Sequence, residues 1–300
     1  MQTQILLRKT SFLDYPGRVS SVFFFPLCNL RCPWCHNREL VLGLEQNLVS
    51  FSLGLSQLHK RRSVIGGVVL TGGEPCLWDE LPELITEIKK IKDDSSRPLL
   101  IKLDTNGMFP LMLETLFSRE ETRPDYISLD LKFSPSRYRE LLPGRLEKRQ
   151  VHETGPGGNN TANINIETTI GKKSASDSSF DPGAALIKSS TLLRDSGITH
   201  EYRTLALPTP FSVMEEKSSI NAPNTAGEYG FVTEKDIEAL SLLVMDDAPW
   251  YFRPFRGGNC LDPTWNDLEE NEEKAAAGAE KLARAARRLG KNGIHVSRLS

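Results

Sequence analysis

Apolar segments with the composition of β-strands recur along this chain, and segments with the spacing of α-helices lie between them. The strand-like segments do not alternate cleanly with polar residues, which is typical of strands buried on both faces of a parallel sheet. Such an order predicts an α/β sheet or barrel with right-handed crossovers. The strands are expected at 19–25, 66–70, 99–105, 126–133, 200–207 and 249–255, and helices at about 50–62, 79–92, 110–120, 183–196 and 233–245.

Polar motifs stand at the ends of these strands. Six strands are fewer than the eight of a closed (β/α) barrel, and functional groups of such folds gather at the carboxyl ends of the strands. We therefore expect these motifs to meet in one site. In strand order they are the cysteines after 19–25, "TGGEP" (71–75), "LDTNG" (103–107), "DLK" (130–132), Arg203, and "RPFRGGN" (253–259).

The size of the chain fits one catalytic domain over residues 1–300, because 39% hydrophobic content can build one large core. Residues 145–182 are rich in Gly, Asn, Ser and Thr and are predicted to be a loop insertion, with a short strand at "NINIETT" as an option. Residues 213–230 form a second expected loop. A C-terminal helical extension is predicted over 266–300, with Gly290 ending its helix; it packs on the barrel or binds a partner.

Charge and hydropathy restrict the classes of partner. A formal net charge of -2 gives no long-range attraction to nucleic acid. The sequence has neither a signal-peptide pattern nor an apolar run of about 20 residues, so no membrane association is expected. Five cysteines without an export signal favour reduced thiols over a disulfide scaffold. We therefore expect a cytoplasmic protein.

Three of the five cysteines lie within "CNLRCPWCHN", as Cys28, Cys32 and Cys35. Thiolates at this spacing can converge on a compact iron-sulfur centre from one loop. A structural zinc site would need a fourth ligand. His36 adjoins Cys35, which makes joint tetrahedral ligation awkward, and Cys76 or Cys260 could approach only through the fold. Iron-sulfur, zinc and free-thiol readings thus remain open from the spacing alone.

The cysteine motif with Trp34 before its last cysteine, together with "GGEP" further along, resembles the radical S-adenosylmethionine (SAM) superfamily. The resemblance implies an α/β fold of the incomplete (β/α)6 barrel type. It also implies a [4Fe-4S] cluster held by Cys28, Cys32 and Cys35, whose open iron binds the amino and carboxylate groups of SAM. The reduced cluster then cleaves SAM to methionine and a 5'-deoxyadenosyl radical, so that the cofactors rather than protein acids and bases carry the chemistry.

The same resemblance implies the residues that contact the cofactor. Gly72 and Gly73 would allow close backbone approach and Glu74 would accept from the cofactor's amino group, although a plain strand-to-helix turn explains them too. Asp104 and Asp130 would hold a monovalent cation or form an ion pair with Lys132. Trp34, Thr105, Asn106, Arg203 and Arg256 complete the set; for Arg203 a surface ion pair is the alternative, and Arg256 replaces a histidine of several relatives.

The remaining histidines fit no metal spacing. His36 is expected to pack beside the cluster or cofactor without ligating metal. His59, His152, His200 and His295 are expected to be ordinary surface or hydrogen-bonded side chains.

Longer segments resemble the anaerobic ribonucleoside-triphosphate reductase activating protein family. They run from "SFLDYPG" through the cysteines and include "GGVVLTGGEP", "IKLDTNG", "DYISLDLKF" and "FRPFRGGNCLDPTW"; the insertion departs from the family pattern. The implied reaction is hydrogen abstraction from a glycine Cα of a partner glycyl radical enzyme, with a flavodoxin- or ferredoxin-type electron donor. The alternatives are a radical SAM enzyme acting on a small molecule, as in 7-carboxy-7-deazaguanine synthase, and a non-enzymatic iron-sulfur or zinc module.

Overall fold

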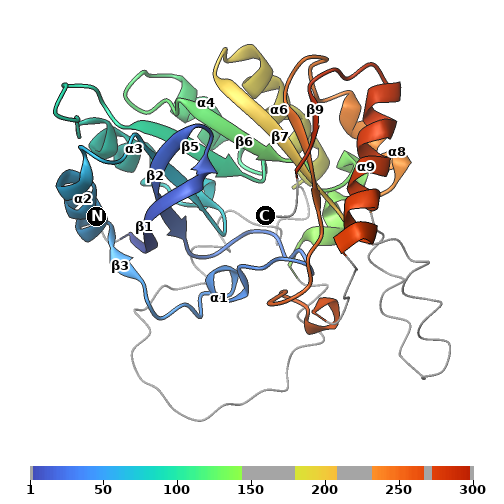
Figure 1. Cartoon of the computed structure of the whole chain (residues 1–300), viewed down its shortest axis with the longest axis horizontal. Coiled ribbons are helices and arrows are strands. Elements are labelled where there is room, and N and C mark those ends of the chain that lie inside the picture. The colour runs from blue at the N-terminus through green and yellow to red at the C-terminus, as the bar shows by residue number, and fades with distance from the viewer. Residues whose placement is uncertain (1–2, 144–179, 208–231, 267–271, 298–300) are drawn as a thin grey trace, which may run out of the picture.

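One curved sheet organises the computed structural model, which describes residues 3–143, 180–207, 232–266 and 272–297 (Figure 1). Six consecutive strands of this sheet run parallel in the order β2-β4-β5-β6-β7-β8, as the strand-helix alternation predicted. In sheet order the strands of this part of the chain are β3 (Val49–Ser50), β1 (Gln4–Tyr15), β2 (Arg18–Phe25), β4 (Gly67–Gly72), β5 (Leu100–Thr105), β6 (Tyr126–Asp130), β7 (Thr199–Ala206), β8 (Trp250–Pro254) and β9 (Ile294–Val296).

Helices line the outer side of the curved sheet (Figure 1). They are α2 (Phe51–Arg61), α3 (Leu81–Lys89), α4 (Pro110–Phe117), α6 (Pro182–Asp195), α8 (Glu234–Ser241) and α9 (Glu272–Arg288), while the short α1 (Arg38–Val41) directly follows the cysteine motif. Short 3-10 turns lie at Pro75–Leu77, Pro135–Leu141 and Pro263–Trp265. No helix in the described segments is both long and apolar enough to cross a bilayer.

The main core lies between the sheet and these helices. Leu103, Ile127 and Phe252 are fully buried there. The inner face of the strands is largely buried, as predicted, but it carries polar and charged side chains such as Lys102 and Ser128. Lys102 and Asp104 flank Leu103 in β5 and point to the inner face, because side chains alternate along a strand. The runs look almost continuously apolar because only a few inner-face positions are polar.

Strand β1 was not predicted. It pairs antiparallel with β2 through a tight turn at Pro16 and Gly17, where Gly17 adopts a φ of +68°, a conformation that glycine tolerates without strain. Its alternation is obscured because much of β1 is exposed, including Phe12 and Leu13. The short strands β3 and β9 were also missed, so the 266–300 extension contains a strand as well as a helix.

The predicted boundaries differ from the observed ones by a few residues. The fourth predicted strand ends at Asp130 rather than residue 133, and the last helix before β8 ends at Ser241. Gly290 follows α9 with a φ of +82°, as expected for a helix terminator. The loop predicted over 213–230 and nearly all of 145–182 lie outside the described residues; at the end of the latter, Asp181 caps α6.

We expect Leu103→Ala to lower the free energy of unfolding by about 2–5 kcal/mol, because Leu103 is fully buried at the centre of the sheet. Leu111→Ala on α4 is the control, since that side chain is 69% exposed, and its effect should stay within about 0.5 kcal/mol. Urea unfolding followed by circular dichroism measures both. Equal effects of the two substitutions would contradict this assignment of the core.

Candidate active site

One cavity of about 460 Å³ opens at the carboxyl ends of the parallel strands. It brings together all the predicted site residues: Cys28, Cys32, Trp34, Cys35, Gly72, Gly73, Glu74, Asp104, Thr105, Asn106, Asp130, Lys132, Arg203 and Arg256. The polar motifs meet there because the strands are parallel and each motif follows the carboxyl end of its strand.

The cysteine motif forms a loop closed by its own hydrogen bonds. Leu27 enters the loop with a φ of +66°, and its N–H donates to the carbonyl of Leu40 at 2.8 Å. The Arg31 guanidinium donates to the carbonyl of Cys28 at 2.7 Å. The N–H of Cys35 donates to the carbonyl of Cys32 at 3.0 Å. These bonds hold the three thiols on one side of the cavity.

The donor set fits an iron-sulfur cluster. All three thiols line the cavity, and burial raises the pKa values of Cys28 and Cys35 and raises the pKa of Cys32 to about 12. Binding of iron therefore has to displace their protons. Within the described segments no three His, Cys, Asp or Glu side chains surround a single metal-ion position. The fit to a cluster therefore rests on the three thiols of one loop lining one cavity.

Two glycines bring the end of β4 against the cysteine loop. A Cβ on Gly73 would lie 1.9 Å from the carbonyl oxygen of Leu27, and Gly72 has a φ of +118°. The N–H of Glu74 donates to the same Leu27 carbonyl at 2.9 Å, and the side-chain amide of Asn37 donates to the carbonyl of Gly72 at 2.9 Å. The glycines are thus needed for contact between the two motifs, beyond making a turn.

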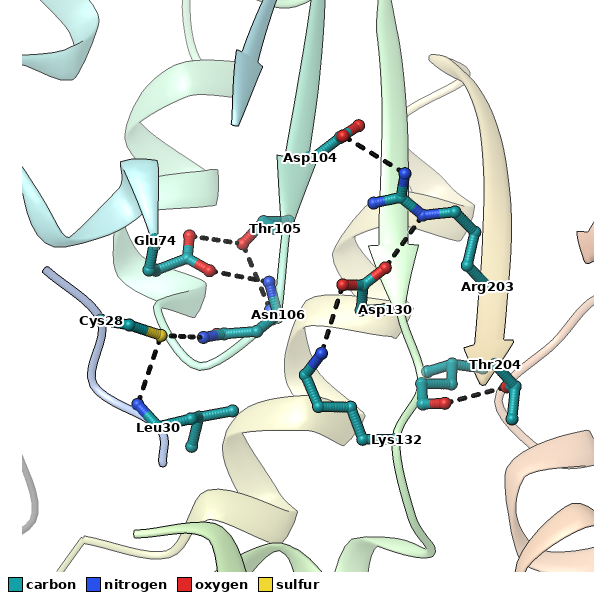
Figure 2. A network of polar contacts seen from close by, with 12 residues as sticks. Cys28, Leu30, Glu74, Asp104, Thr105, Asn106, Asp130, Lys132, Arg203 and Thr204 are labelled. Atoms are coloured by element: carbon teal, nitrogen blue, oxygen red, sulfur yellow. Dashed lines mark hydrogen bonds and ion pairs between the residues drawn. The ribbon is translucent and has the colours of Figure 1, made fainter. Parts of the chain in front are cut away.

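Glu74 connects the "GGEP" and "DTNG" motifs (Figure 2). Its Oε1 accepts from the Thr105 hydroxyl at 2.8 Å and from the N–H of Cys76 at 3.0 Å, while Oε2 accepts from the N–H of Asn106 at 2.8 Å. Burial raises the pKa of Glu74 to about 6, against the effect of these donors. At pH 7 the carboxylate is mostly ionised and holds the two strand ends together.

Asn106 extends this connection to the cluster loop. Its side-chain amide donates to Oδ1 of Asn29 at 2.9 Å and lies 3.7 Å from the Sγ of Cys28 (Figure 2). An N–H directed at a thiolate stabilises its charge. Asn29 and Asn37 were missed in the sequence, because an asparagine in a loop has no periodic signal.

A partly buried chain of ion pairs crosses the opposite side of the cavity (Figure 2). Arg203 donates from Nε to Asp130 at 2.9 Å and from Nη1 to Asp104 at 3.2 Å. Lys132 contacts the second oxygen of Asp130 at 3.3 Å, and Lys102 pairs with Asp104. Arg203 therefore forms two partly buried ion pairs rather than one at the surface. Of the two alternatives for Asp130, a cation site or an ion pair with Lys132, the structure contains the ion pair. No cation site involving these carboxylates is found within the described segments.

The cationic partners keep both carboxylates ionised. Burial alone would favour the protonated acids, but Arg203 and Lys102 lower the pKa of Asp104, and Arg203 and Lys132 lower that of Asp130. The sequence analysis missed Lys102, which lies on the inner face two residues before Asp104.

Aromatic residues from the C-terminal part of the chain cover the cysteine loop. Trp34 packs edge-on against Phe133, which follows β6, at a centroid distance of 5.3 Å, and in a tilted arrangement against Trp265 of the C-terminal part at 5.6 Å. Nε2 of His36 is hydrogen-bonded to the carbonyl of Arg256 at 2.8 Å. Trp34 and His36 therefore fix the loop to β8 and the segment after it. Of the other histidines, His200 is buried and bonded to the Ile198 carbonyl, His295 stacks on Tyr251, His59 is exposed, and His152 lies outside the described residues.

A family model matches the part of the sequence that contains most of the cavity-lining motifs. The family model of the radical SAM superfamily matches residues 22–152. That range contains the cysteine motif and the motifs that end β4, β5 and β6. The match covers less than half of the chain and shows that this part is similar to the radical SAM superfamily. The parallel sheet is consistent with the partial barrel of that class.

Three relatives differ in their named activities. A protein of Methanocaldococcus jannaschii named as a glycyl-radical enzyme activating enzyme is 27% identical over 47% of this chain and 55% of its own length. One of Methanococcus aeolicus named as a GTP 3',8-cyclase is 27% identical over 49% and 50%. The 7-carboxy-7-deazaguanine synthase of Aquifex aeolicus is 34% identical over 27% and 32%. The chain thus spans about half the length of the first two relatives, or less for the third.

Solved structures give weaker matches. The structure of Streptococcus suis SuiB bound to S-adenosylmethionine aligns over 93% of this chain and 48% of its own, with 10% identity and a TM-score of 0.48.

We expect Gly73→Ala to prevent retention of iron after anaerobic reconstitution, because the new methyl group would displace the Leu27 carbonyl and with it the start of the cysteine loop. Gly66→Ala is the matched control, since its Cβ would meet nothing closer than 3.7 Å. Iron and sulfide per chain and the absorbance of the cluster measure the effect. Normal iron content in Gly73→Ala would refute the proposed dependence of the loop on this contact.

Proposed function

We propose that this chain is an enzyme that holds a [4Fe-4S] cluster on Cys28, Cys32 and Cys35 and binds SAM beside it. The observation that carries the proposal is the single cavity lined by these three thiols, the Gly72–Glu74 segment and the charged strand ends. Cluster and SAM, when bound, supply reductive cleavage to a 5'-deoxyadenosyl radical.

The residues of the chain bind and orient the cofactor in this proposal. SAM carries an ammonium, a carboxylate and a sulfonium, so its site needs charges of both signs. Glu74 and the backbone of Gly72 and Gly73 would face the ammonium. Arg203 and Lys132, already held by Asp130, would offer positive charge to the carboxylate without moving far. Trp34, Thr105, Asn106 and Arg256 would complete the walls of the site.

Single Cys→Ala substitutions at Cys28, Cys32 and Cys35 should each abolish cluster assembly and 5'-deoxyadenosine formation, because three thiolates are needed to hold the cluster. Cys260→Ala is the control, since Cys260 is a buried cysteine outside the loop that does not line the cavity, and it should retain both properties. Reconstitution, reduction with dithionite and chromatography of 5'-deoxyadenosine measure the outcome. Undiminished cleavage in a loop variant would disprove the assignment of the ligands.

We further propose that the substrate is a glycine Cα–H of a partner glycyl radical enzyme, with anaerobic ribonucleoside-triphosphate reductase as the leading partner and a flavodoxin- or ferredoxin-type protein as electron donor. The name of the Methanocaldococcus jannaschii relative and the resemblance of the longer motifs support this choice. The partner's glycine loop would have to enter the cavity, because the reacting atoms must come within near-attack distance.

A small-molecule substrate is the second candidate. Relatives named as a GTP 3',8-cyclase and a 7-carboxy-7-deazaguanine synthase support it, since both names denote action on small molecules. The third alternative, a non-enzymatic iron-sulfur or zinc module, leaves the charged strand ends without a role.

Electron paramagnetic resonance separates these candidates. We expect the reconstituted, reduced enzyme with SAM to generate a glycine-centred radical on anaerobic ribonucleoside-triphosphate reductase, and no radical on a partner whose radical glycine is replaced by alanine. Formation of 5'-deoxyadenosine without a partner radical would refute the activase proposal in favour of a small-molecule substrate. The absence of both would refute the enzyme proposal itself.

A further inference from the structure

A second cavity of about 470 Å³ adjoins the first on the inner side of the sheet. It lies between the β1–β2 hairpin, represented by Leu13, Asp14 and Pro16, and strand β8 with Ser297 beyond β9. Shared lining residues join the two cavities: Asp14, Asp104, Arg203, Arg253, Pro254 and Arg256. A molecule in the second cavity can therefore reach the cofactor site from the side.

The acidic groups of this second cavity are already engaged. Asp104 is paired with Lys102 and Arg203. Glu201 accepts hydrogen bonds from the hydroxyls of Tyr126 at 2.8 Å and Ser128 at 2.7 Å. Asp14 is bonded to Ser11 and lies 3.5 Å from Arg8.

Two arginines, in contrast, add positive charge to the lining of this cavity. In the described segments the guanidinium groups of Arg253 and Arg256 form neither an ion pair nor a hydrogen bond, although both line the two cavities. Desolvation and the nearby charge of Arg203 lower the pKa of Arg253, while Asp130, Glu201 and Asp104 act in the opposite direction. An anion placed between these arginines would give both guanidinium groups the direct partner that they lack among the described residues.

The position of Arg253 directs it into the cavity. It lies two residues after Tyr251 in β8, so both side chains project from the same face of the sheet. The backbone of Arg256 is fixed by the hydrogen bond from His36 to its carbonyl. Arginine binds carboxylate and phosphate oxygens through parallel N–H donors. Leu13, which is 82% exposed, Pro16 and Tyr251 add an apolar and aromatic rim.

We propose that this second cavity is the substrate-entry site and that Arg253, with Arg256, binds an anionic group of the substrate, either a phosphate or a carboxylate. The rim contacts an apolar or planar part of the same molecule. The inference rests on the proposed function in one respect: it assumes that the chain is an enzyme and that the bound anionic group belongs to its substrate. A phosphate would indicate a nucleotide-like small molecule, and a carboxylate an acidic residue beside the glycine of a partner protein.

Binding of two probes tests the site without turnover. The reconstituted, unreduced enzyme is titrated by calorimetry with inorganic tripolyphosphate and with an acetylated hexaglutamate peptide, at constant ionic strength, first without SAM and then with saturating SAM. We expect at least one probe to bind, with affinity that falls as chloride is raised. Arg253→Gln should weaken that binding about tenfold or more, because a charge-assisted contact contributes about 1.5–3 kcal/mol.

Matched variants separate charge from structure. Arg253→Lys retains the charge and should bind with intermediate affinity, and Arg256→Gln should also weaken binding. Arg284→Gln, on the exposed side of α9, should match the wild type. If Arg253→Gln fails to fold, as judged by its thermal transition, Arg256→Gln and the chloride dependence of the wild type carry the test.

Three results would overturn the proposal: no binding of either probe to the wild type, equal binding to Arg253→Gln or, where that variant does not fold, to Arg256→Gln, or binding that disappears when SAM is present, which would assign these arginines to the cofactor. The probe that binds distinguishes the phosphate from the carboxylate source. The titration generates no radical, so its result does not depend on whether the activase proposal is correct. Likewise, the activase assay can succeed even if neither probe binds.

Discussion

The close contact between the end of β4 and the cysteine loop is the constraint on which the site depends. Gly72 lies against Phe25 at the end of β2 and Gly73 against Leu27, and Glu74 then binds the next strand end through Thr105 and Asn106. The side-chain amide of Asn106 in turn lies beside the Sγ of Cys28. This continuous set of contacts links two strand ends to one thiol, so that the position of the cluster loop follows from the register of the parallel sheet.

Charge on the inner face of the sheet is the second organising feature. Lys102, Asp104, Asp130 and Arg203 would be costly to bury singly, and they are held in alternating ion pairs that offset the loss of hydration. A packed apolar interior would leave no room for a ligand. The pairing keeps the interior polar and ionised, which suits a cofactor that carries charges of both signs.

The two cavities give the molecule a directional layout. The cysteine loop, where Trp265 packs on Trp34, lies at one side of the first cavity, and Arg253 and Arg256 line both cavities. Under the proposed function, the cofactors would occupy the end near the cysteines and the substrate would enter past the β1–β2 hairpin. The same layout suits a glycine loop or a small molecule, because both need an open side to the barrel.

The sequence by itself determined the six parallel strands, the strand-end position of the polar motifs and the three candidate ligands, because hydrophobic periodicity and short motifs are local signals. It did not reveal β1 or β9, whose exposed or very short segments have weak periodicity. Nor could it assign Asn29, Asn37, Lys102 or Arg253, since their roles depend on neighbours far away in the chain. Only the tertiary structure decided that Asp104 and Asp130 pair with Arg203 and lysines, because electrostatic partners are selected by distance in space rather than by order in the sequence.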